Sequence, residues 1–446
     1  MKDKLQRSLS LRQATAINMI DMVGIGPFIV MPFIIDAMNG PYCLLAWLLG
    51  ALLAFSDGFV WSELGAKWPE AGGSYQFLRK IFGEEKWGNF FAFLYIWQTS
   101  IQAPLVIASG SIGFSQYLNF LIPLDSWQQK IASGGLVILI TFLLYRNIKD
   151  VGKISVFLWL GMLLTFFVLI VSGFTHFNFD QAFDFSTKPD YTSALFFAGL
   201  GQASIKTVYS FLGYYNVCHL GAEIKDPEHN IPRSIFISIT GITILYLLMQ
   251  IAVLGVIPWQ EAKSSTFIVS TFFNRLYGNF AASVATVFIL WIAMASLFSV
   301  MLGYSRVPYA ASLDGNYFKV FSKLHPTKNF PHISLLILAA FSFAFSLLFK
   351  LKEIITAIIV MRILIQFVSQ SLGVIILRKK NVVLPFKMWL FPIPAILGIL
   401  VWMFIFFSSE WIYIVGALSV ILTGTVLFLI FTARNKKWPF LNNNPF

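Results

Sequence analysis

Long apolar runs separated by short polar segments follow one another along almost the whole chain. An α-helix needs about 20 mostly apolar residues to cross a bilayer core of about 30 Å, and these runs approach or exceed that length. The pattern predicts an all-α integral membrane protein with about twelve transmembrane helices. The predicted spans lie near residues 12–38, 41–64, 88–119, 131–145, 154–173, 191–222, 234–256, 280–304, 333–349, 354–377, 388–408 and 411–431.

Composition supports this prediction and narrows the function. The 446 residues are 57% hydrophobic and 12% charged, and the mean hydropathy is +0.75. About twelve spans leave little room for a soluble domain. The sequence contains no phosphate-binding loop, metal-ligand cluster or nucleophile constellation, so we expect no enzyme, no catalytic residue, no metal site and no cofactor.

The distribution of basic residues predicts the orientation in the membrane. With the N-terminus inside, 24 of the 32 Lys and Arg residues fall in inner segments, six in outer loops and two within spans. This bias follows the positive-inside rule and predicts a multi-pass membrane protein with both termini cytoplasmic. The net charge of +12 is then a topology signal. We expect the lipid bilayer and a small-molecule substrate as partners, and no nucleic acid.

The first apolar segment is interrupted near its middle by Gly24, Gly26 and Pro27. Non-helical backbone at that depth is tolerated only where protein or a water-filled cavity surrounds it, because unpaired backbone groups are costly in hydrocarbon. A helix that restarts at Pro27 loses no hydrogen bond, and its open N-terminal end presents amides and a positive dipole to an anion. The break therefore predicts a binding site suited to a carboxylate.

The sixth apolar segment contains a similar interruption, at residues 209–216, within the span 191–222. Paired interruptions five spans apart predict two five-helix halves of opposite topology, 1–173 and 191–380, with a substrate site between the broken helices. The remaining segment, 381–446, would hold two further spans and a cytoplasmic tail. The alternative is that these glycines only allow close helix packing or a kink.

Three polar loops resemble those of one transporter superfamily. Residues 61–75 read WSELGAKWPEAGGSY, residues 222–233 read AEIKDPEHNIPR and residues 305–315 read SRVPYAASLDG. They resemble, in the same order, the loops of the amino acid–polyamine–organocation (APC) permeases. With the two glycine breaks, the resemblance covers roughly residues 11–380.

The resemblance implies a LeuT-like fold, a 5+5 inverted repeat with broken helices 1 and 6, and two C-terminal helices. It also implies that the first-helix loop binds a substrate carboxylate and that carbonyls of the sixth helix bind an α-ammonium group. The substrate-binding candidates that follow are Val23, Gly24, Ile25, Gly26, Phe28, Tyr209, Phe211, Leu212, Gly213 and Tyr215.

Two residues of the first break depart from the usual family pattern and leave the substrate open. Ile25 stands where a hydroxyl residue is usual, and Pro27 removes an amide donor. The loop resembles that of plant-type polyamine transporters, so a polyamine or a cationic amino acid is the alternative substrate. Asn216 offers an amide where an acid would hold a cation better. This favours amino acids, with neutral ones preferred because no acid replaces an aromatic in the sixth break.

Ion coupling has three candidate residues. Asp21 lies three residues before Gly24, on the same helical face, and could accept a proton, pair with a cationic substrate or help to hold sodium. A capping role or a buried structural pair is the alternative. Ser296 and Ser299 share a face of the eighth span and could bind sodium against the first. Exchange without a coupling ion also stays open. For two other intramembrane charges, Asp57 and Arg362, we expect structural ion pairs or snorkelling.

The sequence thus predicts a secondary active transporter, a symporter or exchanger, that moves amino acids across the plasma membrane by alternating access. The alternatives are a polyamine or cationic amino acid transporter and a transport-inactive nutrient sensor that keeps the fold. The sequence does not set the oligomeric state.

Overall fold

The computed structural model describes residues 5–186, 190, 192–349, 351–436 and 438–440. Among these residues the regular structure is entirely helical, with only two isolated bridges between loops. The long helices are α1 (Leu11–Met22), α2 (Gly26–Met38), α3 (Cys43–Lys67), α5 (Trp87–Leu121), α6 (Ser126–Leu144), α7 (Ile148–Thr175), α9 (Ala194–Phe211), α11 (Pro227–Val256), α14 (Asn279–Tyr304), α16 (His332–Leu348), α17 (Leu351–Arg362), α18 (Ser369–Lys379), α19 (Ile393–Phe407) and α20 (Trp411–Arg434). The short elements are α4 (Ser74–Ile81), α8 (Phe179–Ala182), α10 (Asn216–His219), η1 (Gly221–Glu223), α12 (Trp259–Ala262), α13 (Ile268–Tyr277), α15 (Arg306–Leu313), η2 (Lys319–Ser322) and the π-helix η3 (Ile363–Val368).

Most of the long helices can cross a membrane by length and composition. Within the described residues, eight helices pass this test, and the bent pair α1 and α2 passes it as one broken span. The apolar helices α16 and α19 are shorter. The predicted all-α membrane fold is confirmed at this level, whereas the count of twelve spans and the inverted repeat remain predictions.

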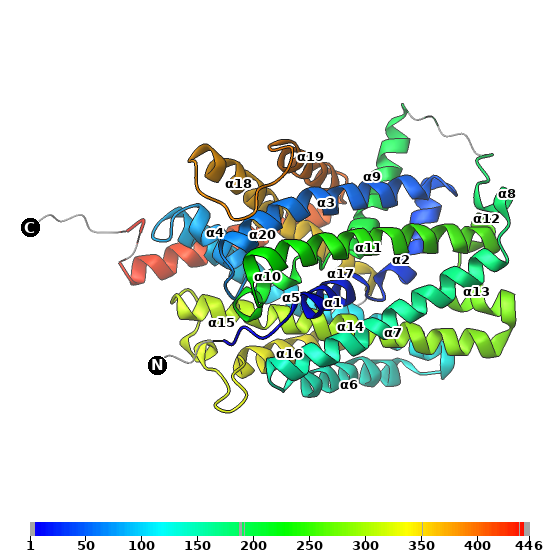
Figure 1. Ribbon diagram of the computed structural model, residues 1–446, viewed down its shortest axis with the longest axis horizontal. Coiled ribbons are helices and arrows are strands. Elements are labelled where there is room, and N and C mark those ends of the chain that lie inside the picture. The colour runs from blue at the N-terminus through cyan, green and yellow to red at the C-terminus, as the bar shows by residue number, and fades with distance from the viewer. Residues whose placement is uncertain (1–4, 187–189, 191, 350, 437, 441–446) are drawn as a thin grey trace, which may run out of the picture.

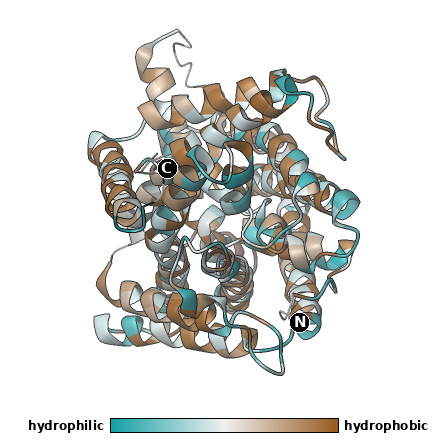
Figure 2. Cartoon of the chain, turned by 90° about the vertical axis from the view of Figure 1, so that its left-hand side faces the viewer, coloured by the Kyte–Doolittle hydropathy of each residue, from teal (hydrophilic) through white to brown (hydrophobic). Residues whose placement is uncertain are grey.

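The helices pack side by side along the long axis of the bundle (Figure 1). The chain enters α1 and leaves α20 at the same end of the bundle (Figure 1). Seen from that end, hydrophobic residues predominate along the helices, and hydrophilic ones gather in the loops (Figure 2). The most hydrophobic part of α20 is only 22% buried, whereas the corresponding part of 356–379 is 72% buried. The bundle thus has an apolar outer surface, as contact with lipid requires, and a protected centre.

The first predicted break is present between α1 and α2. Helix α1 begins with a capping box at Ser10, in which Gln13 takes part, and ends at Met22. Helix α2 begins at Gly26 with Pro27 in its first turn, and its axis is bent by 46° from that of α1. Pro27 cannot donate to the preceding turn, so the helix can only restart there.

The second predicted break lies between α9 and α10. Leu212 is extended, and Gly213 has φ of +122°, a conformation that side-chain-bearing residues rarely adopt. A Cβ atom at Gly213 would lie 2.7 Å from the backbone nitrogen of Met22. Glycine is therefore required both for the turn and for the close approach of the two breaks, which meet at this point.

Candidate functional site

Side chains from neighbouring helices satisfy backbone groups that the breaks set free. The Tyr246 hydroxyl of α11 lies 2.8 Å from the carbonyl oxygen of Met22 and 2.9 Å from that of Ser210, and it donates to both. The Asn18 side-chain oxygen accepts a hydrogen bond of 2.9 Å from the backbone N–H of Val217 in α10. Without such partners, open backbone would be too costly at this depth. The buried Tyr246 hydroxyl thus forms hydrogen bonds to both broken helices.

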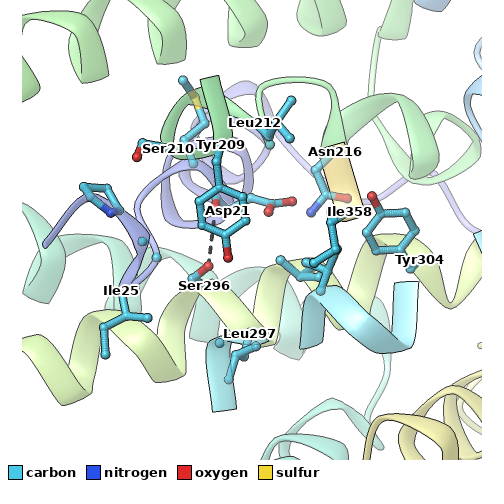
Figure 3. A pocket seen from close by; sticks show the side chains of 18 of the residues that line it. Asp21, Ile25, Tyr209, Ser210, Leu212, Asn216, Ser296, Leu297, Tyr304 and Ile358 are labelled. Atoms are coloured by element: carbon cyan, nitrogen blue, oxygen red, sulfur yellow. Dashed lines mark hydrogen bonds between the residues drawn. The ribbon is translucent and has the colours of Figure 1, made fainter. Parts of the chain in front are cut away.

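A cavity of about 70 Å³ lies where the two breaks meet. Its walls come from α1, α2, α5, α9, α14, α17 and the short segment that includes α10. Figure 3 shows Ile25 and Leu297 on one side of it, Asn216 and Tyr304 on another, and Asp21 between them. Close helix packing alone therefore does not account for the glycines, since the two breaks also enclose a cavity.

Seven of the ten predicted substrate-binding residues line this cavity. Tyr209 spans one wall, because its hydroxyl lies 3.1 Å from the Ser109 hydroxyl of α5 and its ring packs against Gly26. A Cβ atom at Gly26 would lie 2.7 Å from that ring. The seven are Gly24, Ile25, Gly26, Tyr209, Leu212, Gly213 and Tyr215.

The other three predicted residues, Val23, Phe28 and Phe211, do not line the cavity. The ring of Phe211 is 5.3 Å from that of Tyr246, and Phe28 packs at 5.8 Å against Phe166. Successive residues of a helix point in different directions, so only some residues near a break can face one cavity. The rings of Phe28 and Phe211 thus pack against residues that do not line the cavity.

The first break presents amide donors to the cavity. Within the described chain, the backbone N–H groups of Gly24, Ile25 and Gly26 have no recorded acceptor, and all three residues line the cavity. Several carbonyls of the breaks, in contrast, are already engaged. The oxygen of Gly213 accepts from the Asn216 N–H at 2.9 Å, and that of Asp21 accepts from the Ser296 hydroxyl at 3.3 Å. The carboxylate role of the first break remains a prediction.

Two opposite charges also face this cavity. Asp21 lines it, and its carboxylate accepts no hydrogen bond that the structure records within the described chain. Arg362 lines it from the end of α17 and is only 1% exposed. Its Nε donates to Gln366 at 2.8 Å, and one Nη donates to the Tyr215 hydroxyl. The guanidinium also lies over the Tyr215 ring, 5.1 Å from its centre.

Among the cavity-lining residues that sequence reasoning did not place in the site, Arg362 is the charged one. We expected an ion pair or snorkelling, but no acidic side chain of the described residues lies within 4 Å of it. The α-helix changes to the π-helix η3 directly after Arg362, and such local widening is frequent at functional sites. An arginine in an apolar segment was the available signal, because intramembrane charges are functional candidates by default. The π-helix has no sequence signature here.

Ser296 and Ser299, the serines predicted to take part in ion coupling, contact different residues of α1. Ser296 lines the cavity beside Gly24. Ser299 does not line it; its hydroxyl donates to the Ile17 carbonyl at 2.7 Å and accepts from Asn216 at 2.8 Å. Both hydroxyls thus donate to carbonyls of α1. A role in sodium binding is a prediction that these contacts do not decide.

Asp57 lies outside the cavity wall. Its carboxylate accepts hydrogen bonds from the Tyr214 hydroxyl and, at 3.2 Å, from Trp61. The neighbouring tyrosines of the second break therefore point to different partners: Tyr214 to Asp57, and Tyr215 to Arg362. Asp57 is buried and forms no ion pair within the described residues, so these hydrogen bonds stand in place of the ion pair or snorkelling that the sequence predicted.

The fold and the cavity define a multi-pass membrane protein with a small site at a helix break. Comparison with known proteins identifies the family to which the chain belongs. The family model described as "Amino acid permease" matches residues 9–435. The chain therefore belongs to the amino acid permease family of the APC superfamily, and it is a transporter, not an enzyme.

Individual relatives are similar over most of their length. The branched-chain amino acid permease BcaP of Bacillus subtilis is 26% identical over 457 residues, which cover 97% of this chain and 94% of the relative. The serine/threonine exchanger SteT of Bacillus subtilis is 26% identical over 84% of both chains. The Asc-type amino acid transporter 1 of Mus musculus is 25% identical over 96% of this chain and 81% of its own. These relatives support amino acid transport as the class of function.

Proposed function

We propose that this chain is a secondary active transporter that moves amino acids across the plasma membrane by alternating access, with neutral amino acids preferred. The observation that carries the proposal is the cavity at the meeting point of the two helix breaks. Binding at such a point lets the surrounding bundle close over the substrate from either side. The proposal includes twelve spans, repeats at 1–173 and 191–380, and cytoplasmic termini.

The charge of the cavity argues against polycations. An arginine side chain is not deprotonated in proteins, so Arg362 keeps a fixed positive charge in the cavity wall. Two like charges about 4 Å apart repel by about 4 kcal/mol at the effective dielectric constant typical of proteins. A polyamine would meet this repulsion with only Asp21 as an acidic partner among the cavity-lining residues. A zwitterion meets one charge of each sign.

The names of the relatives are compatible with a neutral substrate but do not decide it. BcaP and SteT are described as acting on branched-chain amino acids and on serine and threonine, which are neutral. Another relative is the cationic amino acid transporter 4 of Mus musculus, at 22% identity over 85% of this chain and 61% of the relative. We therefore rest the preference on the fixed charge of the cavity. Asp21 and the pair Ser296 and Ser299 are the proposed sites for a coupling proton or sodium ion.

Uptake into proteoliposomes tests the proposal. The purified protein is reconstituted, and uptake of radiolabelled alanine, valine, arginine and putrescine is measured with and without imposed proton or sodium gradients. We expect saturable uptake of alanine or valine, and an imposed gradient should identify the coupling ion. Liposomes without protein provide the background. Uptake of putrescine without any amino acid would refute the proposed substrate class, and no uptake of any solute would favour a sensor.

A further inference from the structure

Asp21 and Arg362 carry opposite charges and line the same cavity, but they do not form an ion pair with each other. Asp21 and Arg362 belong to α1 and α17, and both line the cavity, yet their charged atoms are more than 4 Å apart. The structure records no hydrogen bond to the Asp21 carboxylate within the described chain. Buried charges without partners are costly in protein and more so in a membrane. A carboxylate without a recorded partner and a guanidinium with one unused Nη, both lining one small cavity, indicate a ligand that carries both complementary charges.

The Arg362 guanidinium is fixed by its neighbours but keeps N–H groups without an acceptor within the described chain. Gln366 accepts from Nε, and the Tyr215 hydroxyl accepts from one Nη, while the structure records no acceptor for the other Nη within the described chain. Stacking over the rings of Tyr215 and Phe367 fixes the plane of the group. A guanidinium oriented in this way is suited to a carboxylate, because its parallel N–H groups match the two oxygens.

The first break has lost donors that a carboxylate would use. Pro27 has no N–H, and Ile25 brings a hydrocarbon side chain to the wall. A charged donor forms a stronger hydrogen bond than a neutral amide. Arg362 adds a charged donor to the cavity wall that carries the N–H groups of Gly24, Ile25 and Gly26 left free within the described chain.

We propose that Asp21 binds the α-ammonium group of the substrate and that Arg362 binds its α-carboxylate. This inference rests on the proposed function, amino acid transport, and adds the residues that recognise the backbone of the substrate. An α-amino acid carries both charges on adjacent atoms, so it can lie between the two side chains and pair both.

The rest of the wall then selects the substrate side chain. It is formed largely by apolar residues, among them Val106, Ala293, Leu297 and Ile358. The cavity volume of about 70 Å³ leaves little room for a long side chain. Small and branched aliphatic amino acids are therefore the substrate class that fits.

Binding of paired ligands to two variants tests the assignment. Alanine and alaninamide differ only at the carboxylate, so the ratio of their affinities reports the carboxylate contact independently of overall stability. We expect the wild-type protein to prefer alanine by about 10- to 100-fold, the range that corresponds to one charged hydrogen bond. In Arg362→Gln this ratio should fall towards one. In Asp21→Asn the preference for alanine over lactate, which lacks the ammonium group, should fall in the same way.

Lys206→Gln is the matched control, because Lys206 is also a cation within a predicted span but lines a separate pocket beside Lys263. It should keep the wild-type ratios. An unchanged ratio in Arg362→Gln would overturn the carboxylate assignment, even where uptake of alanine by the wild-type protein confirms the proposed function. Failure of the wild-type protein to bind any amino acid would overturn both.

If Arg362→Gln does not fold, Arg362→Lys keeps the positive charge and decides the question. Lysine cannot form the two parallel hydrogen bonds, so the account expects alanine to bind about tenfold more weakly while the preference over alaninamide persists. Wild-type affinity for alanine in Arg362→Lys would overturn direct binding by the guanidinium.

Discussion

Tyr246→Phe is the change that most sharply tests how the two breaks are held. It removes one hydroxyl group that donates to the carbonyl oxygens of Met22 and Ser210, 2.8 and 2.9 Å away. The ring itself stays, so its packing against Trp47 and Phe211 is unchanged. The substitution therefore isolates the hydrogen bonds from the volume of the side chain.

The expected magnitude follows from the loss of one buried hydroxyl. A neutral hydrogen bond contributes about 1 kcal/mol, and a buried group left without a partner costs about 1–3 kcal/mol. Because one hydrogen is shared between two carbonyls, we expect a total destabilisation of about 1–3 kcal/mol. Since the carbonyls belong to the two breaks, part of this loss should appear in substrate binding, where about 1.4 kcal/mol corresponds to a tenfold weaker affinity.

Two measurements and one control check this prediction. Thermal unfolding in detergent gives the change in stability, and the KM for alanine in proteoliposomes gives the change in the site. Tyr117→Phe is the matched control, since the Tyr117 hydroxyl is buried and the structure records no hydrogen-bond partner for it. It should leave the KM close to wild type and should not lower the Tm. A Tyr246→Phe protein with the wild-type Tm and KM would refute the view that Tyr246 holds the breaks.

Three further predictions concern the turn at Gly213, a buried ion pair and the segment that follows α8. Gly213→Ala places a side chain at φ of +122° and close to the first break, so we expect a cost of at least about 1–2 kcal/mol and the loss of uptake; wild-type uptake would contradict it. Glu223→Gln breaks a buried two-bond pair with Arg306, at 3.0 Å each, and should cost about 3–5 kcal/mol in thermal unfolding. The exposed pair of Glu261 provides its control, and Glu261→Gln should change stability little. The Asp184 carboxylate accepts hydrogen bonds that lower its pKa. The stability that this carboxylate contributes is therefore present above the ordinary pKa range of aspartate and is lost as the pH falls below that range. Asp184→Asn should flatten the acid side of a plot of stability against pH, and an unchanged plot would contradict this.

The parts of the fold that sequence reasoning predicted are those that depend on local chemistry. The breaks at Gly24 and Gly213 could be predicted because glycine and proline interrupt helices in known ways, and both lie within apolar segments. The loop 61–75 identified the superfamily, and the family match confirms it. The helices could be predicted as well, because an apolar run long enough to cross a membrane must satisfy its backbone hydrogen bonds internally, and a helix does so.

What could not be predicted depends on packing between distant segments. Tyr246 lies 36 residues after Ser210, and nothing in its surrounding sequence indicates that its hydroxyl joins two breaks. Phe211 was placed in the site because of its position in the break, yet the direction of its ring depends on the α3 and α11 side chains behind it. Arg362 lines the cavity from the end of α17, and the change to a π-helix that follows it leaves no pattern in the sequence.

The most direct test of the central claim is a cryo-electron microscopy structure of the protein in lipid nanodiscs with saturating L-alanine. The account predicts density for one alanine in the cavity between the breaks, bounded by Gly24, Gly213 and Tyr209. Its ammonium group should face Asp21 and its carboxylate should face Arg362. Alanine bound elsewhere in the bundle, with only water between the breaks, would contradict the account.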